Sequence, residues 1–257
     1  MAGNVVIITG ASSGMGMEFA LQLDAHLRKT DEIWLIARRR ERLEQLASKM
    51  RNKARIFTMD VTKTAQIERL QDMLIDKDVV VKMLVNCAGF GIIGDFSCMS
   101  VDEQLSMVRT NCEALTHVTH ACLPFMRKNS RIINLASSAS FMPQPGFAVY
   151  AATKAYVNSF SLALREEVKG KGIYVTSVCP GPVATEFFDI AESEGNGTLA
   201  IKKLFMANPG DVVKKALRDS CNKKAKSVYS LPMQSFEVLC KIIPHGIMLP
   251  MVRFIKE

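Results

Sequence analysis

The stretch VVIITGASSGMG, residues 5–16, joins an apolar run to a turn of small residues. The run at 5–9 predicts a buried strand, and apolar residues at helical spacing follow the turn at 16–29. Small residues in such a turn let the backbone approach a pyrophosphate, and the start of the helix offers free N–H donors. The glycine spacing is GxxxGxG, so the flanking strand and helix, more than the glycines alone, predict a phosphate site. Its residues are Gly10, Ser12, Ser13, Gly14, Met15 and Gly16.

The alternation of strand and helix patterns continues along the chain. Segments between the apolar runs place apolar residues at i, i+3 and i+4, as amphipathic helices do. This order predicts an α/β fold with a single doubly wound parallel sheet of about seven strands and helices on both faces, of the Rossmann type. No linker interrupts the pattern, so we expect one domain over residues 1–257. The further predicted strands are 32–37, 54–60, 82–88, 131–137, 173–180 and 227–231.

Two regions depart from the alternation. The polar, glycine-spotted segment at about 186–210 follows the end of a predicted strand, where ligands bind in open α/β sheets, so we expect a lid over the substrate. The tail at about 232–257 is apolar, rich in methionine and divided by Pro244 and Pro250. We expect it to pack on the body or on a dimer partner, and weak contact with a membrane surface is the alternative.

Composition excludes several classes of protein. The chain has 257 residues, 33 basic and 25 acidic, and a net charge of +8, which favours anionic ligands. No apolar stretch approaches the roughly 20 residues of a membrane span, and the N-terminus does not resemble a signal peptide, so we expect a cytoplasmic protein. The seven cysteines are scattered singly, which argues against a structural metal site or a disulfide framework. The basic fragment at 222–226 lacks interleaved aromatic residues, so we expect no nucleic-acid partner.

Arginines follow the second predicted strand. An acid about 20 residues beyond the glycine turn would bind a ribose hydroxyl and indicate NAD. Counting from Gly16 leads to Ile36, with no carboxylate there, and then to Arg38, Arg39 and Arg40. A guanidinium at this strand end can hold a 2′-phosphate through charge-assisted hydrogen bonds. Because basic residues at the start of a helix oppose its dipole, an anionic ligand explains them better than solvent does, and we expect NADP(H).

Three further residues suggest proton transfer. Tyr150 and Lys154 are four residues apart in a helical pattern, so their side chains point to one face. A phenol with a pKa of about 10 is a poor acid or base at neutral pH unless a cation stabilises the phenolate, and Lys154 can be that cation. Ser137 ends the run 131–137, where its hydroxyl can bind a substrate oxygen at the carboxyl edge of the sheet.

Together these features resemble the classical short-chain dehydrogenase/reductase family over residues 4–185. The family usually has NNAG where this chain has NCAG, and its common glycine-rich C-terminal segment, used in tetramer packing, is absent. The motifs occur in the family's order: TGASSGMG at 9–16, Asp60-Val61, Asn86-Cys87-Ala88-Gly89, Asn111, Ser137, YAATK at 150–154, and Pro180-Gly181-Pro182-Val183 with Thr185.

The resemblance implies roles for these residues. Tyr150 would be the general acid in reduction and the base in oxidation, and Ser137 would orient the carbonyl or alcohol. Lys154 would bind the nicotinamide ribose and lower the pKa of Tyr150, and Asn111 would hold a water that passes protons to Lys154. The remaining cofactor contacts would be Asp60 and Val61 at the adenine, Asn86, Ala88 and Gly89 along the fourth strand, and Pro180, Gly181, Val183 and Thr185 beside the nicotinamide.

The resemblance also implies an NADP(H)-dependent oxidoreductase that interconverts a secondary alcohol and a ketone. The apolar tail is similar to that of relatives acting on lipophilic ketones, so we expect a hydroxysteroid, bile-acid or 3-oxoacyl substrate and a place in lipid metabolism. The walls of the substrate pocket would be Phe90, Phe141, Met142, Phe187 and Phe188, beside Ser137 and Tyr150. Relatives pair through the helix carrying Tyr150, so we expect a homodimer, with a tetramer as the alternative.

A different class of function competes with the enzyme. A non-catalytic NADPH-binding sensor or scaffold could keep the same fold without turnover. Such a relative would be expected to have lost at least one member of the catalytic set, whereas Asn111, Ser137, Tyr150 and Lys154 are all present. We therefore favour the enzyme.

Overall fold

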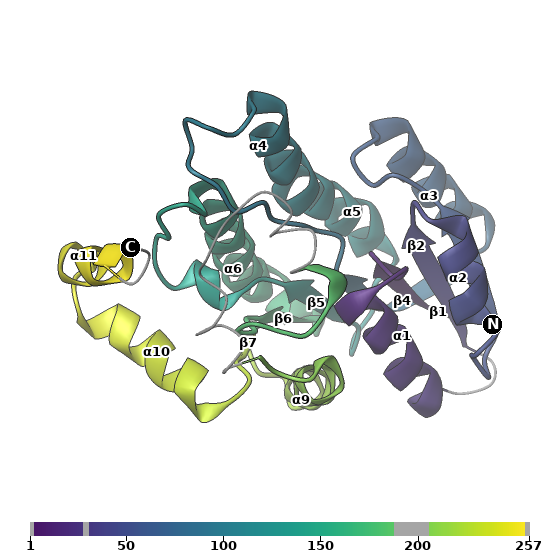
Figure 1. Ribbon diagram of the computed structural model, residues 1–257. Coiled ribbons are helices and arrows are strands. Elements are labelled where there is room, and N and C mark those ends of the chain that lie inside the picture. Colours follow the sequence, from purple (N-terminus) through teal and green to yellow (C-terminus); the bar gives the residue numbers. More distant parts are fainter. Residues whose placement is uncertain (1–2, 28–30, 188–205, 255–257) are drawn as a thin grey trace.

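A computed structural model describes residues 3–27, 31–187 and 206–254, which build one seven-stranded parallel sheet (Figure 1). The strand order is β3-β2-β1-β4-β5-β6-β7, so the chain winds outward in both directions from the β1/β4 pair. This order confirms the predicted doubly wound, Rossmann-type sheet. The strands are β1 (Gly3–Thr9), β2 (Glu32–Ala37), β3 (Ala54–Thr58), β4 (Val79–Asn86), β5 (Arg131–Leu135), β6 (Tyr174–Val178) and β7 (Lys226–Ser227).

Helices cover both faces of the sheet (Figure 1). Side chains alternate along a strand, so Val5 and Ile7 of β1 face one helical layer whereas Val6 and Ile8 face the other. The first layer contains α3 (Thr64–Asp76), α5 (Leu115–Cys122) and α6 (Ala148–Val168), and the second contains α1 (Gly14–His26), α2 (Arg40–Ala47) and α9 (Pro209–Cys221). Strands buried on both faces explain the near-continuous apolar runs of the sequence.

Every strand except β2 differs from the prediction at one or both ends, and three of these differences have a local cause. β4 runs from Val79 to Asn86 rather than over 82–88, because Cys87 leaves the sheet and its N–H, like that of Ala88, lies 3.2 Å from Thr9 Oγ1. β5 ends before Ser137, which instead begins the short helix η3 (Ser138–Ser140) as its N-cap. β7 has only two residues, since Ser230 adopts a positive φ and a helix begins directly after it.

The C-terminal region forms α10 (Leu231–Ile242) and α11 (His245–Phe254) at the end of the sheet beyond β7 (Figure 1). Cys240 and Met248 from these helices pack with Met142 in a small apolar cluster. Much of the predicted lid, residues 188–205, lies outside the described residues, and beside it Ala207 pairs with Val183 in a parallel bridge. No helix in the described ranges is long and apolar enough to cross a membrane.

Candidate active site

The glycine turn lies between β1 and α1, at the point where the strand order reverses. Gly10 has a φ of 67°, and a Cβ there would lie 2.7 Å from the backbone nitrogen of Ala88. A Cβ on Gly16 would overlap the carbonyl oxygen of Gly10. Gly14 also has a positive φ, of 52°, beside Thr185. These positions require glycine because the backbone is left-handed or because neighbouring segments approach too closely for a side chain.

A cavity of about 1060 Å³ opens along the carboxyl edge of the sheet above this turn. Its volume is ample for a dinucleotide together with a small substrate. Most of the predicted site residues line it: Gly10, Ser12, Ser13, Met15, Gly16, Arg38, Arg39, Asp60, Val61, Ala88, Gly89, Phe90, Ser137, Tyr150, Lys154, Pro180, Gly181, Val183, Thr185 and Phe187.

Ser137, Tyr150 and Lys154 meet at one end of the cavity. Tyr150 and Lys154 lie on α6, 6% and 5% exposed, with Lys154 Nζ 5.6 Å from the centre of the tyrosine ring. The hydroxyl of Tyr150 is hydrogen-bonded to the Ser137 side chain. Lys154 Nζ donates to the carbonyl oxygen of Leu135 at 2.8 Å. The helix and the end of β5 therefore bring a phenol, a hydroxyl and an ammonium group together.

Burial shifts the pKa of both titratable groups towards the neutral form. It raises the pKa of Tyr150 to about 12, although the hydrogen bond with Ser137 acts in the opposite direction. It lowers the pKa of Lys154 to about 8. Tyr150 therefore carries its proton at neutral pH and can donate it. Because the shift at Tyr150 arises from burial and Ser137, the lowering of its pKa by Lys154 stays a prediction.

Asn111 lies behind the cavity, 1% exposed, in a π-helical turn η1 (Arg109–Ala114) between α4 (Val101–Val108) and α5. Its side chain accepts from the Phe90 N–H at 3.1 Å and donates to the Phe90 carbonyl oxygen at 2.9 Å. It also donates to Thr153 Oγ1 at 3.0 Å. π-helical turns often mark functional sites. Here the asparagine side chain fixes the loop after β4 against the helix that carries Tyr150, and its predicted water relay stays a prediction.

Aromatic rings surround Tyr150. Phe147 stacks on it with ring centroids 4.1 Å apart and 19° between the planes, and Phe187 lies 5.4 Å away at 48°. A Cβ on Gly91 would come within 2.5 Å of the tyrosine ring. Sequence reasoning missed Phe147 and Gly91, because neither differs by pattern from an ordinary core aromatic residue or loop glycine. Phe147 and Gly91 confine the phenol ring of Tyr150 to a narrow, apolar space.

Five predicted site residues of the described ranges do not line the cavity: Gly14, Asn86, Asn111, Phe141 and Met142. Asn86 was expected to contact the cofactor, but its side chain points into the core and donates to Thr119 Oγ1 and Asn134 Oδ1, both at 2.9 Å. Phe141 was expected to form the substrate pocket, but it packs on Phe236 of α10, with ring centroids 6.2 Å apart. The neighbouring Met142 belongs to the same C-terminal apolar cluster. Phe188 lies outside the described residues.

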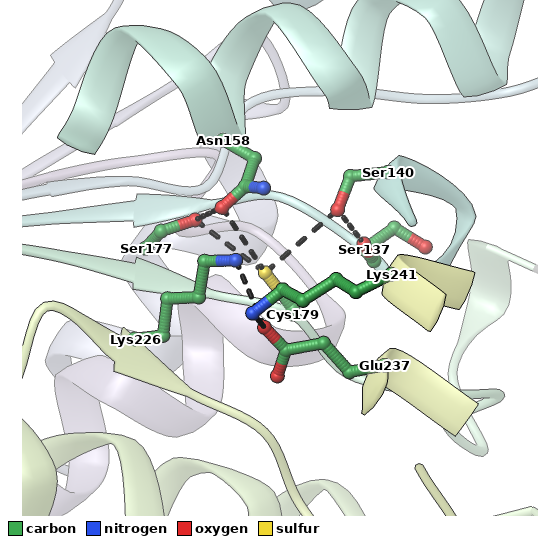
Figure 2. Close-up of polar contacts among 8 residues, drawn as sticks. All are labelled: Ser137, Ser140, Asn158, Ser177, Cys179, Lys226, Glu237 and Lys241. Atoms are coloured by element: carbon green, nitrogen blue, oxygen red, sulfur yellow. Dashed lines mark hydrogen bonds and ion pairs between the residues drawn. The ribbon is translucent and has the colours of Figure 1, made fainter. Parts of the chain in front are cut away.

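Polar contacts hold the backbone of Ser137 in place. Figure 2 shows Ser140 reaching the backbone of Ser137, with Ser140 Oγ donating to the Ser137 carbonyl oxygen at 2.6 Å. Ser140 Oγ also lies 3.9 Å from Cys179 Sγ, which is 3.4 Å from Ser177 Oγ. Beside this cluster, Lys226 Nζ lies 2.9 Å from Glu237 Oε1 (Figure 2). Ser140 therefore ties the backbone at Ser137 to Cys179, the residue that follows β6, and the ion pair beside it joins β7 to α10.

The other end of the cavity is basic. Arg39 hydrogen-bonds through Nη2 to Ser12 Oγ at 3.2 Å and to Ser13 Oγ at 2.6 Å, so its guanidinium lies on the glycine turn. Arg38 is exposed and lies near Asp60. Burial tends to raise the pKa of Asp60, but hydrogen bonds from Thr62 and the charge of Arg38 outweigh it and hold the pKa below its usual value.

These features fit a phosphorylated dinucleotide. Gly10 and Gly16 leave a turn free of side chains at a helix start, which suits a pyrophosphate. Arg39 and its serine partners suit a 2′-phosphate at the adjoining strand end. A Cβ on Gly89 would lie 3.5 Å from Lys154 Nζ. Because Gly89 has no side chain, the cavity stays open between its arginine end and Tyr150.

Comparisons with known proteins agree with this arrangement. A family model described as short chain dehydrogenase matches residues 4–195. Sulfoacetaldehyde reductase 2 of Chromohalobacter salexigens is 37% identical over 194 residues, 72% of this chain and 74% of that protein. An NADP-dependent 3-hydroxy acid dehydrogenase of Escherichia coli K12 is 34% identical over 190 residues, 72% of this chain and 75% of that protein. A closed form of serine dehydrogenase complexed with NADP+ has a TM-score of 0.78 at 29% identity, and the match covers 87% of this chain and 93% of that one.

Proposed function

The chain belongs to the short chain dehydrogenase family, and from this we propose that it is an NADP(H)-dependent oxidoreductase that interconverts an alcohol and a carbonyl group. One observation carries the proposal. Ser137, Tyr150 and Lys154 converge at one end of a cavity whose other end holds a glycine turn and Arg39. The first end offers a proton donor, and the second suits a phosphorylated cofactor.

Tyr150 is the proposed proton donor in reduction. When bound, the nicotinamide cofactor supplies the hydride, and the protein contributes positioning and a proton. The raised pKa keeps Tyr150 protonated, so its hydroxyl can give that proton to a carbonyl oxygen. Ser137, already hydrogen-bonded to Tyr150, would orient the same oxygen. In oxidation the tyrosine would accept the proton from the alcohol.

Lys154 would hold the nicotinamide ribose and favour the deprotonated tyrosine once the proton has left. Its ammonium lies 5.6 Å from the ring centre of Tyr150, and its pKa of about 8 leaves it mostly charged at neutral pH. A nearby positive charge stabilises a phenolate, which is the form that must be reprotonated after each turnover in reduction. We propose that Asn111 supports this exchange by fixing the loop at Phe90.

For the substrate we propose a lipophilic ketone or secondary alcohol, such as a steroid, a bile acid or a fatty 3-oxoacyl compound. The support is local: Phe90, Phe147 and Phe187 line the cavity around Tyr150 and present apolar surface to the reacting group. A small hydroxy acid or aldehyde is the second candidate. It is favoured by the names of two relatives, a 3-hydroxy acid dehydrogenase and a sulfoacetaldehyde reductase.

We further propose a cytoplasmic, single-domain protein that forms a homodimer. The dimer is supported by apolar side chains on the outer faces of α4 and α6, where Val101 is 69% exposed and Tyr156 is 42% exposed. Pairing of these faces would remove them from water. Analytical ultracentrifugation of the purified protein would separate a dimer from a monomer or a tetramer.

The test is the oxidation of NADPH or NADH, followed by absorbance, against steroid ketones, bile-acid ketones, 3-oxoacyl thioesters, small oxoacids and aldehydes. We expect turnover of one class with NADPH preferred, and Tyr150→Phe should reduce that turnover by about 10²- to 10⁴-fold. NADPH binding to the variant should be unchanged. A Tyr150→Phe variant with full turnover would overturn the proposed mechanism. Tight NADPH binding with no turnover by the wild type on any class would favour the sensor.

A further inference from the structure

A carboxylate bridges two arginines at the basic end of the cavity. Glu186 Oε2 lies 3.1 Å from Arg39 Nη1, and Glu186 Oε1 accepts a hydrogen bond from Arg42 Nη1. Arg39 precedes α2 and Arg42 lies in its first turn, three residues later and therefore on the same side of the helix. Glu186 comes from a distant part of the chain, directly after Thr185.

The guanidinium of Arg39 also hydrogen-bonds to the glycine turn. Arg39 bonds to Ser12 and Ser13 through Nη2 and to Glu186 through Nη1. Both Arg39 and Glu186 line the cavity. A phosphate held by Arg39 would therefore lie beside a carboxylate, and like charges at such a distance repel each other.

Glu186 is charged but not held firmly. The hydrogen bond from Arg42, only partly opposed by burial, keeps the pKa of Glu186 below its usual value, and Arg39 acts in the same direction. The side chains of Arg39, Arg42 and Glu186 are 43%, 44% and 39% exposed. Ion pairs exposed to this degree contribute little stability, so a dianionic phosphate can replace the carboxylate.

We propose that Glu186 occupies the place on Arg39 where the cofactor's 2′-phosphate binds. When the phosphate displaces Glu186, Arg42 loses its ion pair with Glu186 and becomes a second guanidinium for that phosphate. The inference rests on the proposed NADP(H) preference and deepens it. Arg42 was not among the residues predicted from the sequence, because nothing in its pattern separates it from a solvated arginine of α2. Glu186 is then a residue that sets cofactor affinity, since each binding event must displace it.

The test uses fragments that reach only this end of the cavity. Isothermal titration calorimetry would measure the dissociation constants of adenosine 2′,5′-bisphosphate and adenosine 5′-phosphate at one fixed ionic strength. Glu186→Gln should bind the bisphosphate about 3- to 10-fold more tightly, because the competing charge is gone. Arg42→Gln should bind it about 3- to 10-fold more weakly. Binding of the 5′-phosphate should change little in either variant.

Matched controls lie in two exposed ion pairs. Glu44 pairs with Arg40 at 2.8 Å on the same helix, so Glu44→Gln removes a carboxylate without touching Glu186. Lys169 pairs with Glu166 at 3.0 Å outside the cavity, so Lys169→Gln removes a positive charge without touching Arg42. We expect both controls to match the wild type. Unchanged binding of the bisphosphate by Glu186→Gln and Arg42→Gln, in a protein that still prefers NADPH, would overturn the inference alone. A wild type that binds NADPH no better than NADH, and the bisphosphate no better than the 5′-phosphate, would overturn the proposed cofactor preference itself.

Discussion

Lys154 Nζ donates a hydrogen bond of 2.8 Å to the carbonyl oxygen of Leu135, so helix α6 is tied to the end of β5 by a buried ammonium group. β5 leads directly to Ser137, and α6 carries Tyr150. The contact therefore sets the spacing between the two groups that are proposed to face the reacting oxygen. It also places a charge where water cannot solvate it, which is costly to the folded state.

That cost predicts how stability depends on pH. Burial lowers the pKa of Lys154 to about 8 from the ordinary lysine value of 10.5, so between these values the unfolded chain binds more protons than the folded one. The free energy of unfolding should therefore rise with pH across this window. Relative to Lys154→Met, the wild type should gain up to about 3 kcal/mol between about pH 8 and pH 10.5.

Urea unfolding of both proteins at several pH values would measure this difference. The comparison cancels the other titratable groups, which the two proteins share. Lys154→Met should also lose turnover at every pH, because the cation beside Tyr150 is gone. A stability difference that stays constant with pH would show that Lys154 titrates at its ordinary pKa in the folded protein.

Gly91 is predicted to be essential for the position of the Tyr150 phenol, the proposed proton donor. A Cβ there would lie 2.5 Å from the Tyr150 ring and 2.9 Å from the Phe147 ring, so Gly91→Ala must displace one of them. Misplacing a catalytic group by about 1 Å can reduce the rate of turnover about 100-fold. Gly170→Ala is the matched control, since a Cβ on Gly170 meets nothing within 4 Å.

NADPH titration and circular dichroism would separate this effect from misfolding. Gly91→Ala should keep its cofactor affinity and secondary structure while kcat falls, and Gly170→Ala should keep all three. Wild-type kcat in Gly91→Ala would mean that the ring moves without consequence for turnover.

The sequence predicted the sheet and most of the cavity because both depend on local pattern. Strands buried on two faces must be apolar throughout, and a turn such as that at Gly10 accepts only glycine. The orientation of the Asn86 side chain could not be predicted because it depends on register. It pairs with Asn134 across β4 and β5, and side chains opposite each other on one face of a sheet meet there, so the amide joins the core. The contact between Glu186 and Arg42 joins residues 144 positions apart in the chain, which no local pattern encodes.

Phe141 and Phe187 should respond differently to truncation. Phe141 packs on Phe236 in the C-terminal cluster, so Phe141→Ala should lower the free energy of unfolding by about 2 to 4 kcal/mol and leave KM unchanged. Phe187 lines the cavity near Tyr150, so Phe187→Ala should raise KM for an apolar substrate and change stability little. Chemical denaturation and steady-state kinetics on both variants would check this assignment. A raised KM in Phe141→Ala with full stability would return Phe141 to the substrate pocket.

Glu237 is predicted to anchor α10 to the sheet. Figure 2 shows the carboxylate of Glu237 beside Lys226 and Lys241. It lies 2.9 Å from Lys226 Nζ and 3.1 Å from Lys241 Nζ, and the side chain of Glu237 is only 14% exposed. Burial tends to raise the pKa of Glu237, but the hydrogen bonds from the two lysines outweigh it and lower that pKa. Glu237→Gln leaves Lys226, with a side chain 20% exposed, without its anion. The free energy of unfolding should fall by about 1 to 3 kcal/mol.

The control is Glu166→Gln, which breaks an exposed pair with Lys169 at 3.0 Å and should change stability by less than about 0.5 kcal/mol. Because a lowered carboxyl pKa stabilises the folded state only above the ordinary value, the gap between wild type and Glu237→Gln should close as the pH falls below about 4.5. Equal stability of Glu237→Gln and wild type at neutral pH would mean that apolar packing of Cys240 and Met248, rather than the ion pair, holds the C-terminal helices in place.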